Sequence, residues 1–135
     1  MLFTVRHARP SETFALSELA ARTFPLACPP TLARAHIDAY VRENLSAEHF
    51  ATHIEHPEHD VLVATVGPEI LGYALVLFGP DGSPAPGLGV TLNPAGLLSK
   101  CYTDPKVHGT KAGASLLVAA EERARERHAE GLWLN

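Results

Sequence analysis

The stretch that decides the fold of this chain occupies residues 101–117 and reads CYTDPKVHGTKAGASLL. Its first residues are typical of a strand end, and Asp104-Pro105 stops the strand because proline has no N–H for the ladder. Small residues follow, and an Ala/Leu-rich helix begins at Thr110 or Lys111. This order of strand, turn and helix brings free backbone N–H groups and the positive end of a helix dipole together. The stretch therefore predicts a binding site for an anion such as a pyrophosphate.

The residues before this stretch alternate between helical and extended patterns. Three prolines within residues 25–30 exclude a helix there, and Gly67-Pro68 joins two β-rich runs as a hairpin. Four prolines and five glycines in residues 79–96 predict a long, mobile loop. The predicted elements are a strand at 2–7, a helix from Pro10 that closes at Pro25, a helix at 31–44, a short helix from the N-cap Ser46 through Ile54, strands at 60–66 and 69–78, and a strand at 97–103.

The residues after the stretch continue the helix to about His128 and end in an apolar strand at 131–135. We expect its inward side to carry Gly113, Leu116, Leu117, Ala120 and Ala124. The earlier helices are expected to turn Phe14, Leu16, Leu19, Ala20 and Phe24, and then Ala33, Ile37, Tyr40, Val41 and Leu45, toward the core. Mixed helices and strands over 135 residues predict an α/β fold in a single domain, residues 1–135.

Composition and charge exclude several classes of protein. A net charge of −4, with no basic stripe, argues against a nucleic-acid partner. The longest apolar runs are too short to span a membrane, and the first six residues lack the order of a signal peptide. Cys28 and Cys101 are isolated, so neither a disulfide framework nor a zinc knuckle is indicated. We therefore expect a cytoplasmic protein.

The turn and helix resemble the acetyl-coenzyme A loop of the GNAT superfamily of N-acetyltransferases. The pattern of that loop is Arg/Gln-x-x-Gly-x-Gly/Ala after the fourth strand, and here it reads His108-Gly109-Thr110-Lys111-Ala112-Gly113. His108 stands where Arg or Gln is usual, and Lys111 stands where the first glycine is usual. The order of predicted elements also matches that family as far as its fifth strand. The resemblance thus covers nearly the whole chain.

This resemblance implies a GNAT-like mixed, mostly antiparallel sheet flanked by helices, which splits open between the strand ending at Thr103 and the one beginning at Gly131. The family continues with a helix, often carrying a tyrosine general acid, and two more strands, so the fold is expected to be truncated after its fifth strand. The implied reaction is transfer of an acetyl group from acetyl-coenzyme A, the co-substrate, to a primary amine of a small molecule or peptide. The implied coenzyme-binding residues are Cys101, Tyr102 and Thr103 for the pantetheine arm, and His108, Gly109, Thr110, Lys111, Ala112, Gly113 and Ala114 for the pyrophosphate.

Lys111 leaves two outcomes open. If the turn needs a positive φ or a bare backbone against phosphate, a lysine costs on the order of 1 kcal/mol or more. Its ammonium group can instead offset this cost by pairing with a phosphate. Activity impaired by Lys111, and by the missing general acid, is therefore part of the expectation.

The catalytic residues are not identified by the sequence. The acetyl acceptor must lose a proton to a base, but the strand before Cys101 carries no carboxylate. Asp38, Glu43 and Glu48 are candidates, although surface positions explain each of them equally well. Cys101 is expected to be a packed thiol rather than a nucleophile, and Tyr40 and Trp133 are expected to be core residues.

A group of histidines forms a second candidate site. His49 and His53 have the i, i+4 spacing that can hold zinc on a helix. No HExxH motif accompanies them, and histidines near a helix C-terminus are favoured by its dipole. We therefore predict no metal site, with a metal-binding protein as the alternative.

A different class of function also stays open. The chain can be a catalytically silent coenzyme-A-binding or dimerising module derived from the same fold. Thiol release from acetyl-coenzyme A in the presence of amines separates an enzyme from a binding module. The apolar residues 132–134 favour covering by another chain, so we predict a homo-oligomer with weak turnover.

Overall fold

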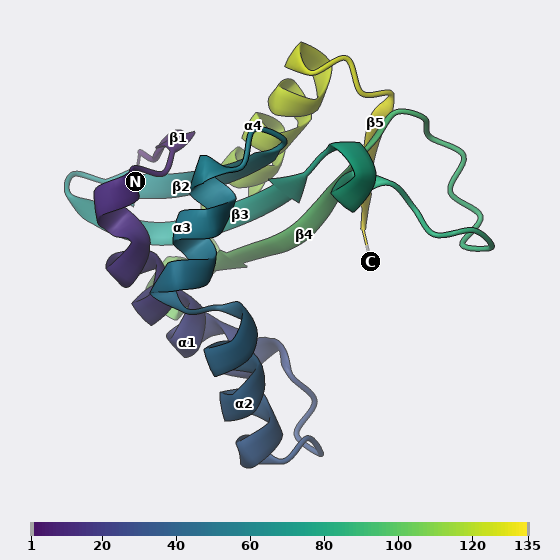
Figure 1. Cartoon of the computed structure of the whole chain (residues 1–135). Helices are drawn as coiled ribbons and strands as arrows, with labels where there is room; N and C mark the ends of the chain where they lie inside the picture. Colours follow the sequence, from purple (N-terminus) through teal and green to yellow (C-terminus); the bar gives the residue numbers. More distant parts are fainter. Residues whose placement is uncertain (1, 135) are drawn as a thin grey trace.

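A computed structural model describes residues 2–134 as a five-stranded sheet with helices on both faces (Figure 1). The strands lie side by side in chain order, and the first four are antiparallel. The last strand runs parallel to the fourth. The strands are β1 (Thr4–His7), β2 (His59–Val66), β3 (Glu69–Leu77), β4 (Ala95–Thr103) and β5 (Gly131–Leu134). The predicted mixed, mostly antiparallel α/β fold is confirmed.

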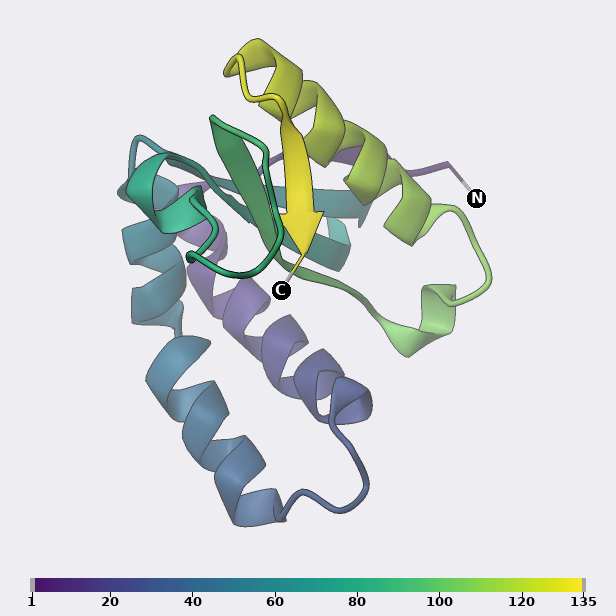
Figure 2. The same ribbon diagram turned by 90° about the vertical axis from the view of Figure 1, so that its right-hand side faces the viewer.

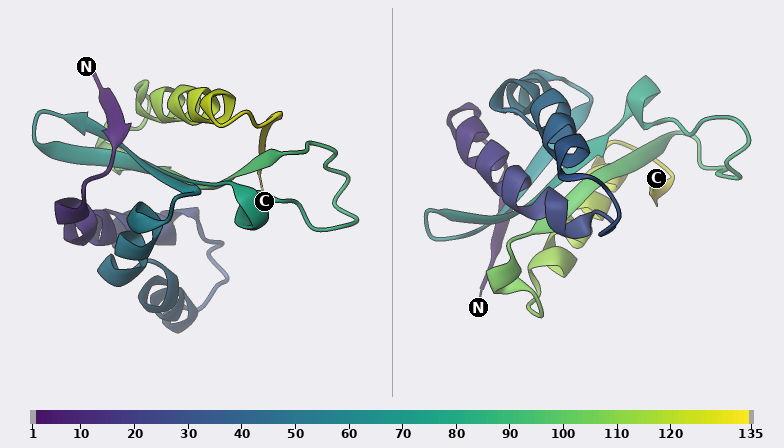
Figure 3. Two further views of the ribbon diagram at one scale, coloured as in Figure 1. Left: turned by 45° about the horizontal axis from the view of Figure 1, so that its top comes forward. Right: turned by 90° about the horizontal axis from the view of Figure 1, so that it is seen from below.

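The helices divide between the two faces of the sheet. Three of them cover one face, and the fourth covers the other (Figure 3). They are α1 (Thr13–Ala27), α2 (Arg34–Asn44) and α3 (Ala47–Glu55) on the first face and α4 (Ala112–Glu126) on the second. The 3-10 turns are η1 (Pro10–Glu12), η2 (Gly79–Gly82) and η3 (Pro105–Val107). None of the helices within residues 2–134 has both the length and the apolar content needed to cross a membrane.

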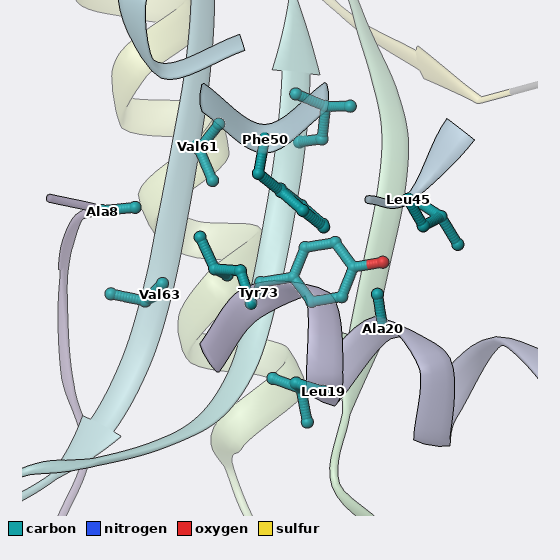
Figure 4. Close-up of a cluster of buried hydrophobic side chains, with 10 residues drawn as sticks. Ala8, Leu19, Ala20, Leu45, Phe50, Val61, Val63 and Tyr73 are labelled. Atoms are coloured by element: carbon teal, nitrogen blue, oxygen red, sulfur yellow. The ribbon is translucent and has the colours of Figure 1, made fainter. Parts of the chain in front are cut away.

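Successive side chains along each strand point to opposite faces of the sheet, so the protein has two cores, one on each face. Val61 and Val63 of β2 face α1 and α3, whereas the alternate residues Leu62 and Ala64 face α4. The first core is centred on Tyr73, whose ring meets that of Phe50 edge-on at 5.4 Å (Figure 4). The second core consists of small and aliphatic side chains, such as Leu116, Ala120 and Ala124 of α4 packed on β2, β3 and β4. Both faces of the central strands are therefore buried.

Two helix boundaries differ from the sequence prediction. Pro25 was expected to end the first helix, but α1 continues through it to Ala27. A proline this close to the end removes only one backbone hydrogen bond, and the Pro25 carbonyl still accepts from the Cys28 amide at 3.2 Å. The next helix begins at Arg34 rather than at residue 31. The predicted N-cap Ser46 is confirmed, because its hydroxyl accepts a hydrogen bond from the His49 amide.

The predicted loop at 79–96 is shorter in the structure. Its first four residues form η2, and β4 begins at Ala95, two residues before the predicted start. The irregular part is therefore 83–94. Three predicted core residues are also exposed: Phe14 of α1 is 70% exposed, Leu117 of α4 is 42% exposed, and Ala33, the N-cap of α2, is exposed as well. Phe14 and Leu117 lie on helices whose neighbouring positions already supply the buried side.

Candidate functional site

The edge between β4 and β5 is only half closed. β5 pairs with β4 at Ala95–Leu98, whereas β4 continues to Thr103. Along its other edge β4 stays paired with β3 as far as Thr103. Within the described residues, the segment 99–103 has no strand partner on the β5 side. Figure 2 shows β4 running on past β5 toward the turn before α4. The Asp104 amide bonds to Leu71, so alternation along β4 turns the main-chain groups of Tyr102 toward β3 and those of Cys101 and Thr103 toward the open edge.

A buried carboxylate fixes the turn that follows β4. Asp104 is 6% exposed and accepts hydrogen bonds from the Lys106 amide at 3.1 Å and from the Arg22 guanidinium of α1 at 3.2 Å. Burial favours the neutral acid, but these hydrogen bonds outweigh it and lower the pKa of Asp104. Its own amide extends the sheet by donating to Leu71. The start of the turn is therefore anchored to both β3 and α1.

The rest of the turn leaves several amides unused. The Thr110 hydroxyl donates to the Val107 carbonyl and accepts from the Ala112 amide, which closes the loop on itself. In the described chain, no acceptor is present for the main-chain amides of Gly109, Lys111, Gly113 and Ala114. The last two belong to the first turn of α4, whose dipole is positive at this end. The turn therefore offers free main-chain donors of the kind that the predicted anion site requires.

The backbone conformation at Lys111 shows whether a lysine is strained in this turn. Its backbone has φ −90° and ψ 10°, a conformation open to any residue, so the lysine is not strained there. The residue that needs glycine is Gly109, with φ +80°. At Gly113 an added Cβ meets no atom within 4 Å. The side chain of Lys111 is exposed beside these amides.

His108 and β4 also line a cleft that the sequence did not reveal. The cleft has a volume of about 210 Å³ and is lined by Thr23, Leu26, Ala27, Cys101, Tyr102, Thr103 and His108. The His108 ring lies 3.2 Å from the Thr103 carbonyl oxygen through Nε2. The contribution of α1 was missed because Pro25 was expected to end that helix. Only Leu26 and Ala27 follow Pro25 in α1, too few residues to give a helical pattern that the sequence could have shown.

An aromatic group extends from β4 across α1 to α2. The rings of Phe24 and Tyr40 stack at 4.5 Å, and Tyr102 meets Phe24 edge-on at 6.5 Å. The ammonium of Lys100 lies 5.6 Å from the centre of the Tyr40 ring, close enough for a cation–π contact. Burial raises the pKa of Tyr102. Tyr40 is thus partly buried beside a charged strand residue rather than fully enclosed.

None of the proposed catalytic groups is assembled at the cleft. Asp38 pairs with Arg34 at 3.0 Å on α2, and Glu43 and Glu48 are exposed. Burial raises the pKa of the Cys101 thiol, which keeps it protonated, as expected for a packed cysteine. No carboxylate is among the cleft-lining residues of the described chain. Trp133, expected in the core, is half-buried and donates to the Gly82 carbonyl.

The arrangement of sheet and helices is the one found in N-acetyltransferases of known structure. A PaiA N-acetyltransferase from Thermoplasma acidophilum, crystallised with coenzyme A, superposes with a TM-score of 0.79 at 17% identity, over 95% of this chain and 75% of that one. A GCN5-related N-acetyltransferase from Ralstonia eutropha gives a TM-score of 0.74 at 15% identity, over 99% and 83% of the two chains. These similarities show the fold.

Sequence comparison adds the family. The sequence profile of the acetyltransferase (GNAT) family matches residues 15–135. An uncharacterized N-acetyltransferase of Mycobacterium tuberculosis is 38% identical over 119 residues, which is 88% of this chain and 69% of that protein. A protein of the same description from Mycobacterium bovis matches equally well. The chain belongs to the GNAT family of acetyltransferases.

Proposed function

We propose that this protein transfers an acetyl group from acetyl-coenzyme A to the primary amine of a small molecule or peptide. The observation that carries the proposal is the set of unpaired amides at Gly109, Lys111, Gly113 and Ala114, at the positive end of α4 and beside the open edge of β4. These donors fit a pyrophosphate, which needs several hydrogen bonds and positive potential. The neighbour crystallised with coenzyme A has the same fold.

The open edge of β4 suits the rest of the co-substrate. In this proposal a pantetheine arm lies along Cys101, Tyr102 and Thr103, and the outward main-chain groups of Cys101 and Thr103 are the donors and acceptors for its amides. N–H groups of the same edge then stabilise the negative charge that develops on the thioester carbonyl. The cleft between α1 and β4, next to the Tyr102 ring, is our candidate for the acceptor. Residues 1–135 act as one domain in this proposal.

A coenzyme-A-binding module without catalysis is the second candidate. The observation that favours it is the cleft lining, in which the described chain supplies no carboxylate to take a proton from an ammonium acceptor. Thiol release separates the two candidates. An enzyme releases free thiol from acetyl-coenzyme A when a panel of amines is added, whereas a module is stabilised by coenzyme A and releases none.

The binding site is tested by removing one unpaired amide. Ala114→Pro deletes a donor that has no acceptor in the described chain, in the first turn of α4 where proline is tolerated. We expect it to weaken coenzyme A binding while the fold is retained. Glu48→Pro is the matched control, because it makes the same change in the first turn of α3. Equal affinity in both variants contradicts the proposed site.

Thermal denaturation supplies the reference measurement. A ligand that binds only the folded state stabilises it by roughly 2.7 kcal/mol at about one hundred times its dissociation constant. We expect coenzyme A to raise the melting temperature of the wild-type chain and of Glu48→Pro, but to have a smaller effect on Ala114→Pro. No shift at millimolar coenzyme A removes the main support for the proposal.

We also propose that copies of the chain associate through α4 and β5. A cleft of about 450 Å³ between them has Leu98, Leu117, Leu132 and Leu134 in its lining, and Leu134 is 73% exposed. An apolar surface of this kind favours association. Glu121 and Arg125 at the same cleft offer charges of both signs, which suits the self-complementary surface of a two-fold interface. The cytoplasmic location stays a prediction.

A further inference from the structure

A second group of polar side chains lies at the opposite end of the sheet from the turn before α4. His53 and His56 come from the end of α3, His59 from the first residue of β2, and Asp81 from η2. The first residue of β2 pairs with Leu77, the last of β3, whereas the coenzyme turn follows Thr103 of β4, which pairs with Gly72 nearer the other end of β3. The group is therefore separate from the proposed coenzyme site.

The donor atoms of this group are close together. Nε2 of His59 lies 2.8 Å from Oδ2 of Asp81, and Nε2 of His56 lies 4.0 Å from the same oxygen. His56, His59 and Asp81 each offer one ligand atom, and these atoms all lie within 4.8 Å of one another. On its other side, Nδ1 of His59 lies 3.0 Å from Nδ1 of His53.

The backbone holds these residues in place independently of their side chains. The His59 amide donates to the His56 carbonyl at 3.2 Å, which fixes the turn between α3 and β2. The Phe78 amide donates to the Glu58 carbonyl at 2.8 Å, and η2 follows at once. The side chain of His59 is only 7% exposed. Backbone hydrogen bonds thus hold the end of α3, the start of β2 and η2 close together.

We propose that His56, His59 and Asp81 bind a divalent transition ion of the zinc class, with His53 as the residue that orients His59. Two imidazole nitrogens and one carboxylate oxygen form a donor set typical of zinc with an open fourth position. Magnesium and calcium prefer oxygen donors alone, so this set excludes them. The side chains of Asp81 and His56 are 55% and 36% exposed, which leaves the fourth position accessible to water.

The orienting role of His53 follows from the tautomer that the ion selects. When Nε2 of His59 binds a metal, its proton is on Nδ1 and needs an acceptor. Nδ1 of His53 is 3.0 Å away and can be that acceptor. Histidine ligands in metal sites are held in this way by a second group, and its loss weakens binding by about 10- to 100-fold.

Binding also requires one ring to turn. The rings of His56 and His59 are stacked at 3.7 Å with planes 7° apart, so their lone pairs do not converge on one point. The Glu58 amide donates to Nδ1 of His56, and this hydrogen bond is lost when Nε2 binds an ion. His56 is only partly buried at the end of α3, and its ring must leave this stack and this hydrogen bond to turn toward the ion. His59 and Asp81 then form the prearranged pair, and His56 completes the site.

This site differs from the i, i+4 pair that the sequence suggested. His49 turns away, with Nδ1 at 2.6 Å from the Ser46 hydroxyl, so the pair His49 and His53 does not form the centre. The proposed site departs from the prediction of no metal site. An ion here ties α3, β2 and η2 together, so its effect is expected on stability rather than on acetyl transfer.

The experiment is calorimetric titration of the tag-free, chelator-treated protein with zinc chloride, and with magnesium chloride as a second probe. We expect one zinc ion per chain and no magnesium binding. Asp81→Asn and His56→Gln should each weaken zinc binding by more than about tenfold, and His53→Ala by about 10- to 100-fold. Tetrahedral cobalt absorption bands in the wild type should be lost in Asp81→Asn.

His49→Gln and His36→Gln are the matched controls, since one lies on the same helix and the other is exposed on α2. Both should bind zinc as the wild type does. Circular dichroism verifies that each variant is folded, and the two ligand variants replace partly exposed residues to keep the fold intact. The proposal is overturned if the wild type binds no zinc at about 100 µM, or if Asp81→Asn and His56→Gln bind as tightly as the controls.

Discussion

Lys111 departs from the family pattern, but its backbone has a conformation that a lysine adopts without strain. The residue is exposed, and its own amide and those of Gly109, Gly113 and Ala114 are unpaired in the described chain. We therefore expect Lys111→Ala to weaken coenzyme A binding by up to about fivefold, the value of an exposed ion pair of 0.2–1 kcal/mol. Lys106→Ala is the control, because that lysine already pairs with Glu69 at 2.7 Å.

Titration calorimetry at low and high salt measures this effect. The difference between the wild type and Lys111→Ala should shrink at about 1 M salt, where exposed charges are screened. Tighter binding by Lys111→Ala would instead mean that the side chain obstructs the phosphates.

The hydroxyl of Tyr73 is a second residue-scale feature with a measurable consequence. It is buried without a hydrogen-bond partner in the described chain, among Leu19, Ala20 and Leu45 (Figure 4). An unsatisfied buried polar group destabilises a fold. We expect Tyr73→Phe to raise the free energy of unfolding by up to about 1 kcal/mol, measured by urea denaturation. Tyr102→Phe should change it little, and a clear loss of stability in Tyr73→Phe would reveal a partner for the hydroxyl.

Prediction from sequence succeeded at this scale where chemistry is local. Ser46 was expected as an N-cap, and its hydroxyl bonds an amide three residues away. The free amides of the turn followed from the order of strand, turn and helix. The ring of His59 and the carboxylate of Asp81 meet across 22 residues of sequence, and no local pattern indicates such a contact. The unpaired state of Tyr73 likewise depends on three separate helices.

Among the elements, the turn before α4 contains two glycines that should respond in opposite ways. Gly109 has φ +80°, so Gly109→Ala is expected to destabilise the protein by about 1 kcal/mol or more. Gly113 lies in a helix with open space around an added Cβ, so Gly113→Ala should stabilise it by up to about 1 kcal/mol. Urea denaturation of both variants measures the two changes. A shift of the same sign in both would contradict this geometry.

The attachment of α4 to the sheet should depend on pH. Asp60 of β2 is buried and accepts hydrogen bonds from Arg123 and Arg127 of α4. Burial alone favours the neutral acid, but the two arginines outweigh it and lower the pKa of Asp60 below its usual 3.8. The carboxylate therefore stabilises the fold above about pH 3.8, and this contribution is lost as the pH falls through the lowered pKa.

We expect Asp60→Asn to lower the free energy of unfolding at neutral pH by about 1.5–3 kcal/mol, the range for hydrogen bonds to charged groups. The deficit should shrink as the pH falls below the usual carboxyl pKa of 3.8. Asp38→Asn is the control, because its exposed pair with Arg34 is worth little. Denaturation curves between pH 7 and pH 2 measure both variants. A deficit that stays constant on acidification would mean that shape, rather than charge, is what Asn fails to replace.

For the molecule as a whole, the order of elements and their pairing could be predicted because each strand and helix has its own pattern. The opening between β4 and β5, implied by the resemblance, is confirmed by a register that ends at Leu98. The cleft beside Tyr102 could not be predicted, since it depends on α1 continuing through Pro25. Boundaries of this kind are decided by packing against the sheet, which offsets one lost backbone hydrogen bond.

The exposed leucines between α4 and β5 are expected to make whole molecules associate. Leu117 of α4 and Leu134 of β5 are large, exposed and lie on the walls of the same 450 Å³ cleft. If copies associate there, the negative charge introduced by Leu117→Glu should prevent the interface from forming, because burying an unpaired charge is costly. Sedimentation at micromolar concentration should therefore find an oligomer for the wild type and a monomer for Leu117→Glu. Leu88→Glu, in the irregular segment after η2, adds the same charge at another exposed leucine and should leave the oligomer intact. A monomeric wild type would exclude this surface as the interface.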